Sequence, residues 1–111
     1  MAKARIINIV TTECPPEMDA KFNKWYNEVH IPMLMKYKGI KKVTRYKTVE
    51  APGARPKYIA VYEYDDQAAL TGQFGSPEFK AVREEMEQTR KSLTFDLKGA
   101  MSCEPIKTWE Q

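Results

Sequence analysis

Alternating hydrophobic and polar residues predict four β-strands along the chain. Residues 4–12 are rich in isoleucine, valine and threonine, and their nearly continuous apolar character is typical of a strand inside a sheet. Residues 39–50 alternate without a strongly apolar face, and their lysines favour an edge strand. Residues 57–66 and 93–104 give the third and fourth strands. A loop with proline and glycine, residues 51–56, separates the second strand from the third.

Side chains on the last two strands divide into two faces, because successive residues of a strand point to opposite sides. In the third strand one face carries Tyr58, Ala60, Tyr62 and Tyr64, and the other carries Ile59, Val61 and Glu63. In the fourth strand one side carries Phe95, Leu97, Gly99 and Met101. Both faces of the predicted sheet therefore hold bulky side chains.

Hydrophobic residues that recur every three or four positions predict helices between these strands. Residues 14–30 place four of them on one helical face, namely Met18, Phe22, Trp25 and Val29. Pro32 predicts that this helix fails near His30, because a proline disfavours helical geometry in the residue before it. Asp66 is the expected cap of a short helix, and Ser76 is the expected cap of a longer one that begins with a proline.

The order strand, helix, strand, strand, helix, strand predicts one α+β domain over residues 1–111. It is the ferredoxin-like βαββαβ arrangement, an antiparallel four-stranded sheet with both helices on one face. A single chain would then leave a large apolar patch uncovered. We expect the tyrosine-bearing faces of two copies to bury each other in a two-fold homodimer. Residues 104–111 form a C-terminal tail, whose Trp109 is expected to dock on another surface.

Composition and charge exclude several classes of function. The net charge of +3 comes from basic and acidic residues that are interleaved, so no footprint for nucleic acid is visible. No apolar run approaches the ~20 residues that a membrane span needs. Without a secretory signal we expect a cytoplasmic protein, in which Cys14 and Cys103 are free thiols. A single histidine and the lack of clustered ligands predict no metal site.

His30 is the first candidate for chemistry, because histidine is the side chain that titrates near neutral pH. On a helical wheel it flanks the buried face, where it can reach the edge of a cavity. It is then either a general acid–base or a side chain that bonds a free carbonyl at the helix end.

The other candidates also have two interpretations each. Asn8 either serves a site or faces water, and Trp25 is either a cavity wall or core packing. Arg45 either binds an anionic substrate group or protects a sheet edge, and Glu63 is a possible partner for it or for His30. Three tyrosines either orient a phenolic or carbonyl substrate or pack in the core or the interface, namely Tyr46, Tyr62 and Tyr64.

Residues 22–47, FNKWYNEVHIPMLMKYKGIKKVTRYK, resemble the dimeric α+β barrel superfamily, in particular its EthD-like members. The matching pattern is an aromatic helix with W-Y-x-E-x-H-x-P, then a glycine and a strand that bears R-Y. The segment KYIAVYEYDD is similar to the third strand of that group. The resemblance implies a homodimer with one pocket per subunit between sheet and helices, and it maps the family's functional histidine onto His30.

The resemblance and the residues together give one leading hypothesis and two alternatives. The leading hypothesis is a small-molecule enzyme or enzyme accessory without a cofactor, in which His30 performs acid–base chemistry on an aromatic or lactone-like substrate. Tyr62, Tyr46 and Asn8 would line the cavity, and Trp25 would form part of its wall. The alternatives are a non-catalytic dimer that binds a small molecule, and a haem or quinol monooxygenase of the same fold, which a Soret shift on addition of haem would reveal.

Overall fold

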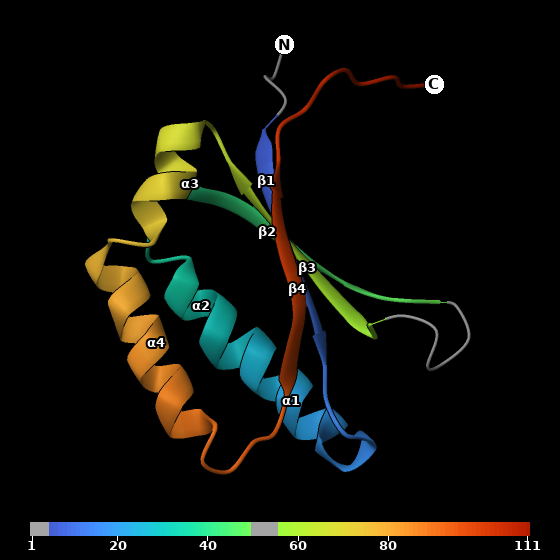
Figure 1. The fold of residues 1–111 in the computed structure, drawn as a ribbon, viewed down its shortest axis with the longest axis vertical. Coiled ribbons are helices and arrows are strands. Elements are labelled where there is room, and N and C mark those ends of the chain that lie inside the picture. Colours follow the sequence, from blue (N-terminus) through green and yellow to red (C-terminus); the bar gives the residue numbers. More distant parts are fainter. Residues whose placement is uncertain (1–4, 50–55) are drawn as a thin grey trace.

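The computed structural model describes residues 5–49 and 56–111 (Figure 1). The first half of the chain forms strand β1, a short 3₁₀ helix η1, helix α1, a π-helical turn η2, helix α2 and strand β2. Their bounds are Ile6–Glu13, Pro16–Met18, Asp19–Trp25, Tyr26–His30, Ile31–Leu34 and Ile40–Lys47. The second half forms β3, α3, α4 and β4, which span Tyr58–Tyr64, Gln67–Gln73, Pro77–Thr89 and Asp96–Cys103.

The strands form one antiparallel sheet in the order β2-β3-β1-β4, and the helices lie on one face of it (Figure 1). This confirms the expected α+β, ferredoxin-like arrangement and places β2 at an edge. The two predicted caps are also present, because Asp66 accepts the N–H of Ala69 at 2.8 Å and Ser76 accepts that of Phe79 at 3.1 Å. The predicted loop falls mostly on residues 51–55, which lie outside the described residues.

The first helix does not fail at His30, so that prediction was wrong. Ile31, which precedes Pro32, has φ −63° and ψ −46°, and the helix continues to Leu34. The Ile31 N–H bonds to the Tyr26 carbonyl five residues earlier, which makes residues 26–30 a π-turn. A proline in a regular helix clashes with the carbonyl four residues before it. The wider π-turn is a local adjustment that lets the helix pass the proline.

The assignment of the two sheet faces is corrected by the structure. The face with Tyr58, Tyr62 and Tyr64 is buried beneath the helices rather than open to a second copy. The open face carries aliphatic side chains in register, since Ile9 pairs with Val61 of β3 and with Met101 of β4. Alternation alone does not show which of two apolar faces the helices cover, and the tyrosine hydroxyls find their partners on the helix side.

A β-bulge also divides the fourth strand, in which Phe95, Leu97, Gly99 and Met101 were expected to share one side. Thr11 pairs with Gly99, whereas the next residue, Thr12, pairs with Leu97. The extra residue places Leu97 opposite Thr12, which is buried beneath the helices, while Met101 lies opposite Ile9. Sequence periodicity cannot reveal such a shift, because it depends on pairing with β1.

Aromatic rings dominate the core between α1 and the sheet. The Phe22 ring is fully buried and lies 5.3–6.3 Å from the ring centres of its neighbours Trp25, Tyr26, Tyr58 and Phe95. Residues 104–111 form no helix or strand, and Trp109 is 76% exposed, so its expected docking is not made within the described part of the chain.

Candidate functional site

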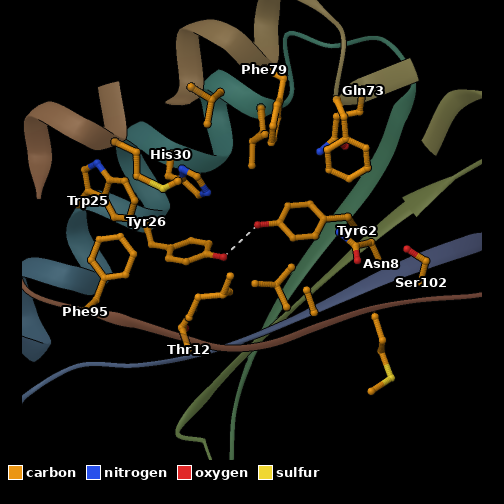
Figure 2. Close-up of a pocket in the computed structure, with 18 of the residues that line it drawn as sticks. Asn8, Thr12, Trp25, Tyr26, His30, Tyr62, Gln73, Phe79, Phe95 and Ser102 are labelled. Atoms are coloured by element: carbon orange, nitrogen blue, oxygen red, sulfur yellow. Dashed lines mark hydrogen bonds between the residues drawn. The ribbon is translucent and has the colours of Figure 1, made fainter. Parts of the chain in front are cut away.

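A cavity of about 390 Å³ lies between the sheet and the helices (Figure 2). This volume is in the range of small-molecule sites, ~300–1,000 Å³. Most of its wall is apolar and comes from α4 and the sheet, with Val10, Phe79, Val82, Met86 and Leu97 among the lining side chains. A few polar side chains reach the same space, which is the usual composition of a binding pocket.

His30 lines this cavity from the π-turn and is 8% exposed. Its ring stacks on Trp25 with centres 4.7 Å apart and meets the edge of Tyr26 at 4.9 Å. Nδ1 is buried and has no hydrogen-bond partner in the described residues. A buried, unpaired polar atom of this kind costs about 1–3 kcal/mol.

Burial sets the charge state of His30. Loss of water around the ring lowers its pKa to about 4, the nearby Glu85 carboxylate opposes this, and Arg45 reinforces it. The imidazole is therefore neutral at pH 7 and can accept a proton. The alternative interpretation expected the His30 ring to bond a free carbonyl at the helix end. Within the described residues no such bond is present.

Two tyrosine hydroxyls face each other across the cavity floor. The hydroxyls of Tyr26 and Tyr62 are 3.0 Å apart, as the dashed line in Figure 2 marks. Burial raises the pKa of Tyr26 and raises that of Tyr62 well above its ordinary value, so both stay protonated. Because one proton joins the two oxygens, the other remains available to a ligand. The Arg45 guanidinium lies 4.3 Å from the Tyr26 ring centre.

A carboxylate behind the cavity holds Trp25 in place. The indole Nε1–H donates to both oxygens of Glu85, at 3.0 and 3.2 Å, and Thr89 donates to the same carboxylate. Glu85 lies on α4, so this contact ties the aromatic helix to α4. The orientation of Trp25, and of the imidazole stacked on it, is fixed by that link.

The structure brings together four of the residues that the sequence suggested, since Asn8, Trp25, His30 and Tyr62 all line the cavity. The remaining three lie elsewhere. Arg45 and Tyr46 line a separate open cleft of about 410 Å³, where Arg45 bonds to Asn27 at 2.8 Å. Tyr64 is fully buried and donates to Gln73. Glu63 pairs with Arg5 at 3.4 Å, not with Arg45 or His30 as suggested.

Sequence reasoning missed five polar residues of the cavity, namely Thr12, Tyr26, Gln73, Arg90 and Ser102. Gln73 is a buried amide at the end of α3, and Arg90 directly follows α4. Neither belongs to a motif, and an isolated glutamine or arginine on a helix normally indicates a solvated face. In the described ranges 5–49 and 56–111, no group of three or more His, Cys, Asp or Glu side chains is arranged to hold a metal ion. Nor does any helix in these ranges have the length and apolarity needed to cross a bilayer.

A family model described as a domain of unknown function, DUF4286, matches residues 5–98. No curated protein matches the chain. Solved structures do match it. An EthD family protein from Bacillus halodurans has a TM-score of 0.66 at 20% identity, over 91% of this chain and 99% of its own.

Two further solved structures match the chain, and both are described as having a ferredoxin-like fold. A Dabb family protein with a ferredoxin-like fold from Mesorhizobium loti has a TM-score of 0.65 at 15% identity, over 96% of this chain and all of its own (100%). A dimeric protein of unknown function with a ferredoxin-like fold, from Bacteroides fragilis, has a TM-score of 0.61 at 14% identity, over 93% of this chain and 96% of its own. These matches confirm the ferredoxin-like α+β fold, with an EthD family protein among its structural relatives.

Proposed function

The chain belongs to the DUF4286 family, and from its cavity we propose a small-molecule enzyme that moves a proton beside a carbonyl group without a cofactor. The substrate is aromatic or lactone-like. His30 takes the proton, and the Tyr26–Tyr62 pair binds the carbonyl oxygen. One observation carries the proposal: a buried imidazole lines an apolar cavity, beside two phenols that hold one unused proton.

The charge states suit this chemistry. A neutral imidazole starts in the form of a base, and Glu85 behind Trp25 would favour the imidazolium that forms on proton transfer. As the proton leaves carbon, negative charge grows on the carbonyl oxygen, where a preorganised donor has its largest effect. The tyrosine pair offers such a donor in a site with little water. Return of the proton to another carbon of the same molecule completes an isomerisation without any further reactant.

Exchange of deuterium into a carbonyl compound tests this step without knowledge of the natural substrate. Aryl ketones and benzo-fused lactones, incubated in D₂O, are followed by proton NMR at the carbon beside the carbonyl. We expect the protein to accelerate exchange for the members that bind. His30→Gln should lower that rate by about 10²–10⁴, and Tyr62→Phe by about 10²–10³. Arg83→Gln, on the surface of α4, is the control; an unchanged rate in His30→Gln would remove the assignment of the base.

The non-catalytic alternative is supported by the apolar character of the cavity wall, which suits retention of a ligand as well as turnover. It predicts binding of the same compounds with no exchange above the background rate. Native mass spectrometry of freshly purified protein is then expected to show a retained small molecule, whereas a ligand-free spectrum would speak against it.

We also propose that two copies pair through their open sheet faces. That face is a continuous row of aliphatic side chains, including Ile9, Val61 and Met101, and uncovered rows of this kind mark interfaces. The Bacteroides fragilis relative is described as dimeric. In sedimentation velocity at micromolar concentration we expect a two-copy mass for wild type and a single-copy mass for Val61→Lys. Val49→Lys is the matched control, because Val49 is 99% exposed outside the strands. A wild type that sediments as one copy would contradict the pairing.

A further inference from the structure

We propose that the ligand of the cavity is an acid, an apolar or aromatic molecule whose carboxylate binds to Arg90 and whose neutral oxygen lies at the opposite end. This rests on the proposed function in one respect, namely that the cavity is the ligand site. It goes further because it names the charge of the ligand and the side chain that recognises it.

The cavity carries a single positive charge. Among the described side chains that line the cavity, Arg90 is the one with a formal charge, and no carboxylate lines it. Glu85, the acid behind the wall, is bonded to Trp25 and Thr89. A low-dielectric cleft with a charge of one sign raises the local concentration of ligands of the opposite sign. An anion therefore gains more from this cavity than a neutral molecule of the same shape.

Arg90 is held by Phe95. Its Nη1–H donates to the Phe95 carbonyl at 3.2 Å, and its guanidinium lies 4.0 Å from the Phe95 ring centre. The planar group is therefore oriented before a ligand arrives, although the residue is exposed at the mouth. In the described part of the chain no hydrogen bond uses Nε or Nη2. Two parallel N–H groups of an oriented guanidinium fit a carboxylate.

Arg90 is linked through aromatic rings to one end of the cavity. The Phe95 ring is tilted against Trp25, with ring centres 5.2 Å apart, and the Trp25 ring stacks on His30. Figure 2 shows Phe95 and Trp25 at one end of the cavity, and it shows the neutral side chains Asn8, Gln73 and Ser102 at the other, with the tyrosine pair between. A carboxylate at Arg90 would direct the body of a ligand past Trp25 and His30. A ketone, lactone or hydroxyl oxygen would then meet the tyrosines or the amides.

This assignment differs from the interpretation of the sequence, in which Arg45 was the candidate for an anionic group. Arg45 lines a different cleft, and its Nη1 is already bonded to Asn27. Arg90 carries no sequence signal of its own. Its role follows from the packing of the residues after α4 against Phe95.

A matched pair of probes tests the proposal. We would titrate 4-acetylbenzoate and 4-acetylbenzamide, which differ in charge but carry the same ketone. The Trp109→Phe variant leaves Trp25 as the one tryptophan, so its indole N–H signal in a ¹H–¹⁵N spectrum reports binding inside the cavity. At low salt we expect the acid to bind about five- to tenfold more tightly than the amide, in line with a charge-assisted hydrogen bond at an exposed site. Added salt should reduce the difference.

Arg90→Gln in the same background should bring the acid to the affinity of the amide and leave the amide unchanged, which also shows that the cavity is intact. Arg83→Gln is the control, because Arg83 lies on the same helix over the Phe79 ring and does not line the cavity. Equal binding of acid and amide, or a preference that survives in Arg90→Gln, would overturn the proposal and leave the proposed function standing. Failure of both probes to shift the indole signal would count against the ligand site itself and against the proposed function.

Discussion

Acid is expected to destabilise the native state through His30. In the folded chain burial lowers the pKa of His30 from 6.5 to about 4, so the unfolded chain binds more protons between these two values. His30 therefore leaves the free energy of unfolding unchanged above pH 6.5 and lowers it as the pH falls from 6.5 towards 4. At about 1.4 kcal/mol for each tenfold change in proton affinity, the full loss is about 3 kcal/mol. That is a large part of the ~5–15 kcal/mol that holds a typical domain folded.

Urea denaturation of wild type and His30→Gln, at several pH values from 7.5 to 4, measures this loss. Other groups titrate in the same range, but they are common to both proteins, so the difference between the two curves isolates His30. The free energy of unfolding of His30→Gln should fall less with acid, by about 3 kcal/mol at pH 4. Because the chain has one histidine, an NMR titration of its imidazole gives the pKa directly. A value near 6.5, or parallel curves for the two proteins, would refute the reasoning.

Two further predictions concern packing. A Cβ on Gly39 would lie 2.4 Å from the Tyr37 ring, whose hydroxyl bonds to the Ala69 carbonyl, so Gly39→Ala should lose about 1–3 kcal/mol of unfolding free energy. Gly75 has open space around it, so Gly75→Ala should be nearly neutral. Equal urea midpoints for the two variants would contradict this prediction. Tyr62→Phe leaves the Tyr26 hydroxyl buried without its partner and should cost about 1–3 kcal/mol. Replacing both tyrosines should cost less than the sum of the single changes, and a strictly additive result would show that the hydroxyl pair is not coupled.

Features of the fold that depend on local chemistry could be predicted from the sequence. The caps at Asp66 and Ser76 are examples, because a side-chain oxygen that bonds a backbone N–H three residues ahead needs no distant partner. The order of elements follows from hydrophobic periodicity in the same way. Features that depend on long-range pairing could not be predicted, as the bulge between Thr11 and Thr12 shows.

The buried face of the sheet is a second case of long-range control. Tyrosine suits either a core or an interface, because its ring is apolar and its hydroxyl needs one partner. The partners come from helices remote in sequence, since Tyr58 donates to Asp19 at 2.5 Å and Tyr62 meets Tyr26. Alternation in β3 shows that four residues share a face but does not show which layer covers them.

The candidate site was predictable where residues cluster in a motif. The W-Y-x-E-x-H-x-P segment identified Trp25 and His30, and both line the cavity. Arg90 and Gln73 reach the same cavity from α4 and α3, whose sequences give no sign of it. A binding pocket assembled from several elements is visible only after those elements have packed.

The π-turn at residues 26–30 has a consequence for how this site can arise or disappear. In a regular helix, residues five apart point about 140° away from each other, so an imidazole meets at most the ring four positions earlier. Here His30 contacts two consecutive aromatic residues, Trp25 and Tyr26. One additional amino acid in a turn therefore gives the imidazole a second ring to rest on. Deletion of one residue from this turn would therefore take away one of the two ring contacts and also the room that the helix uses to pass Pro32.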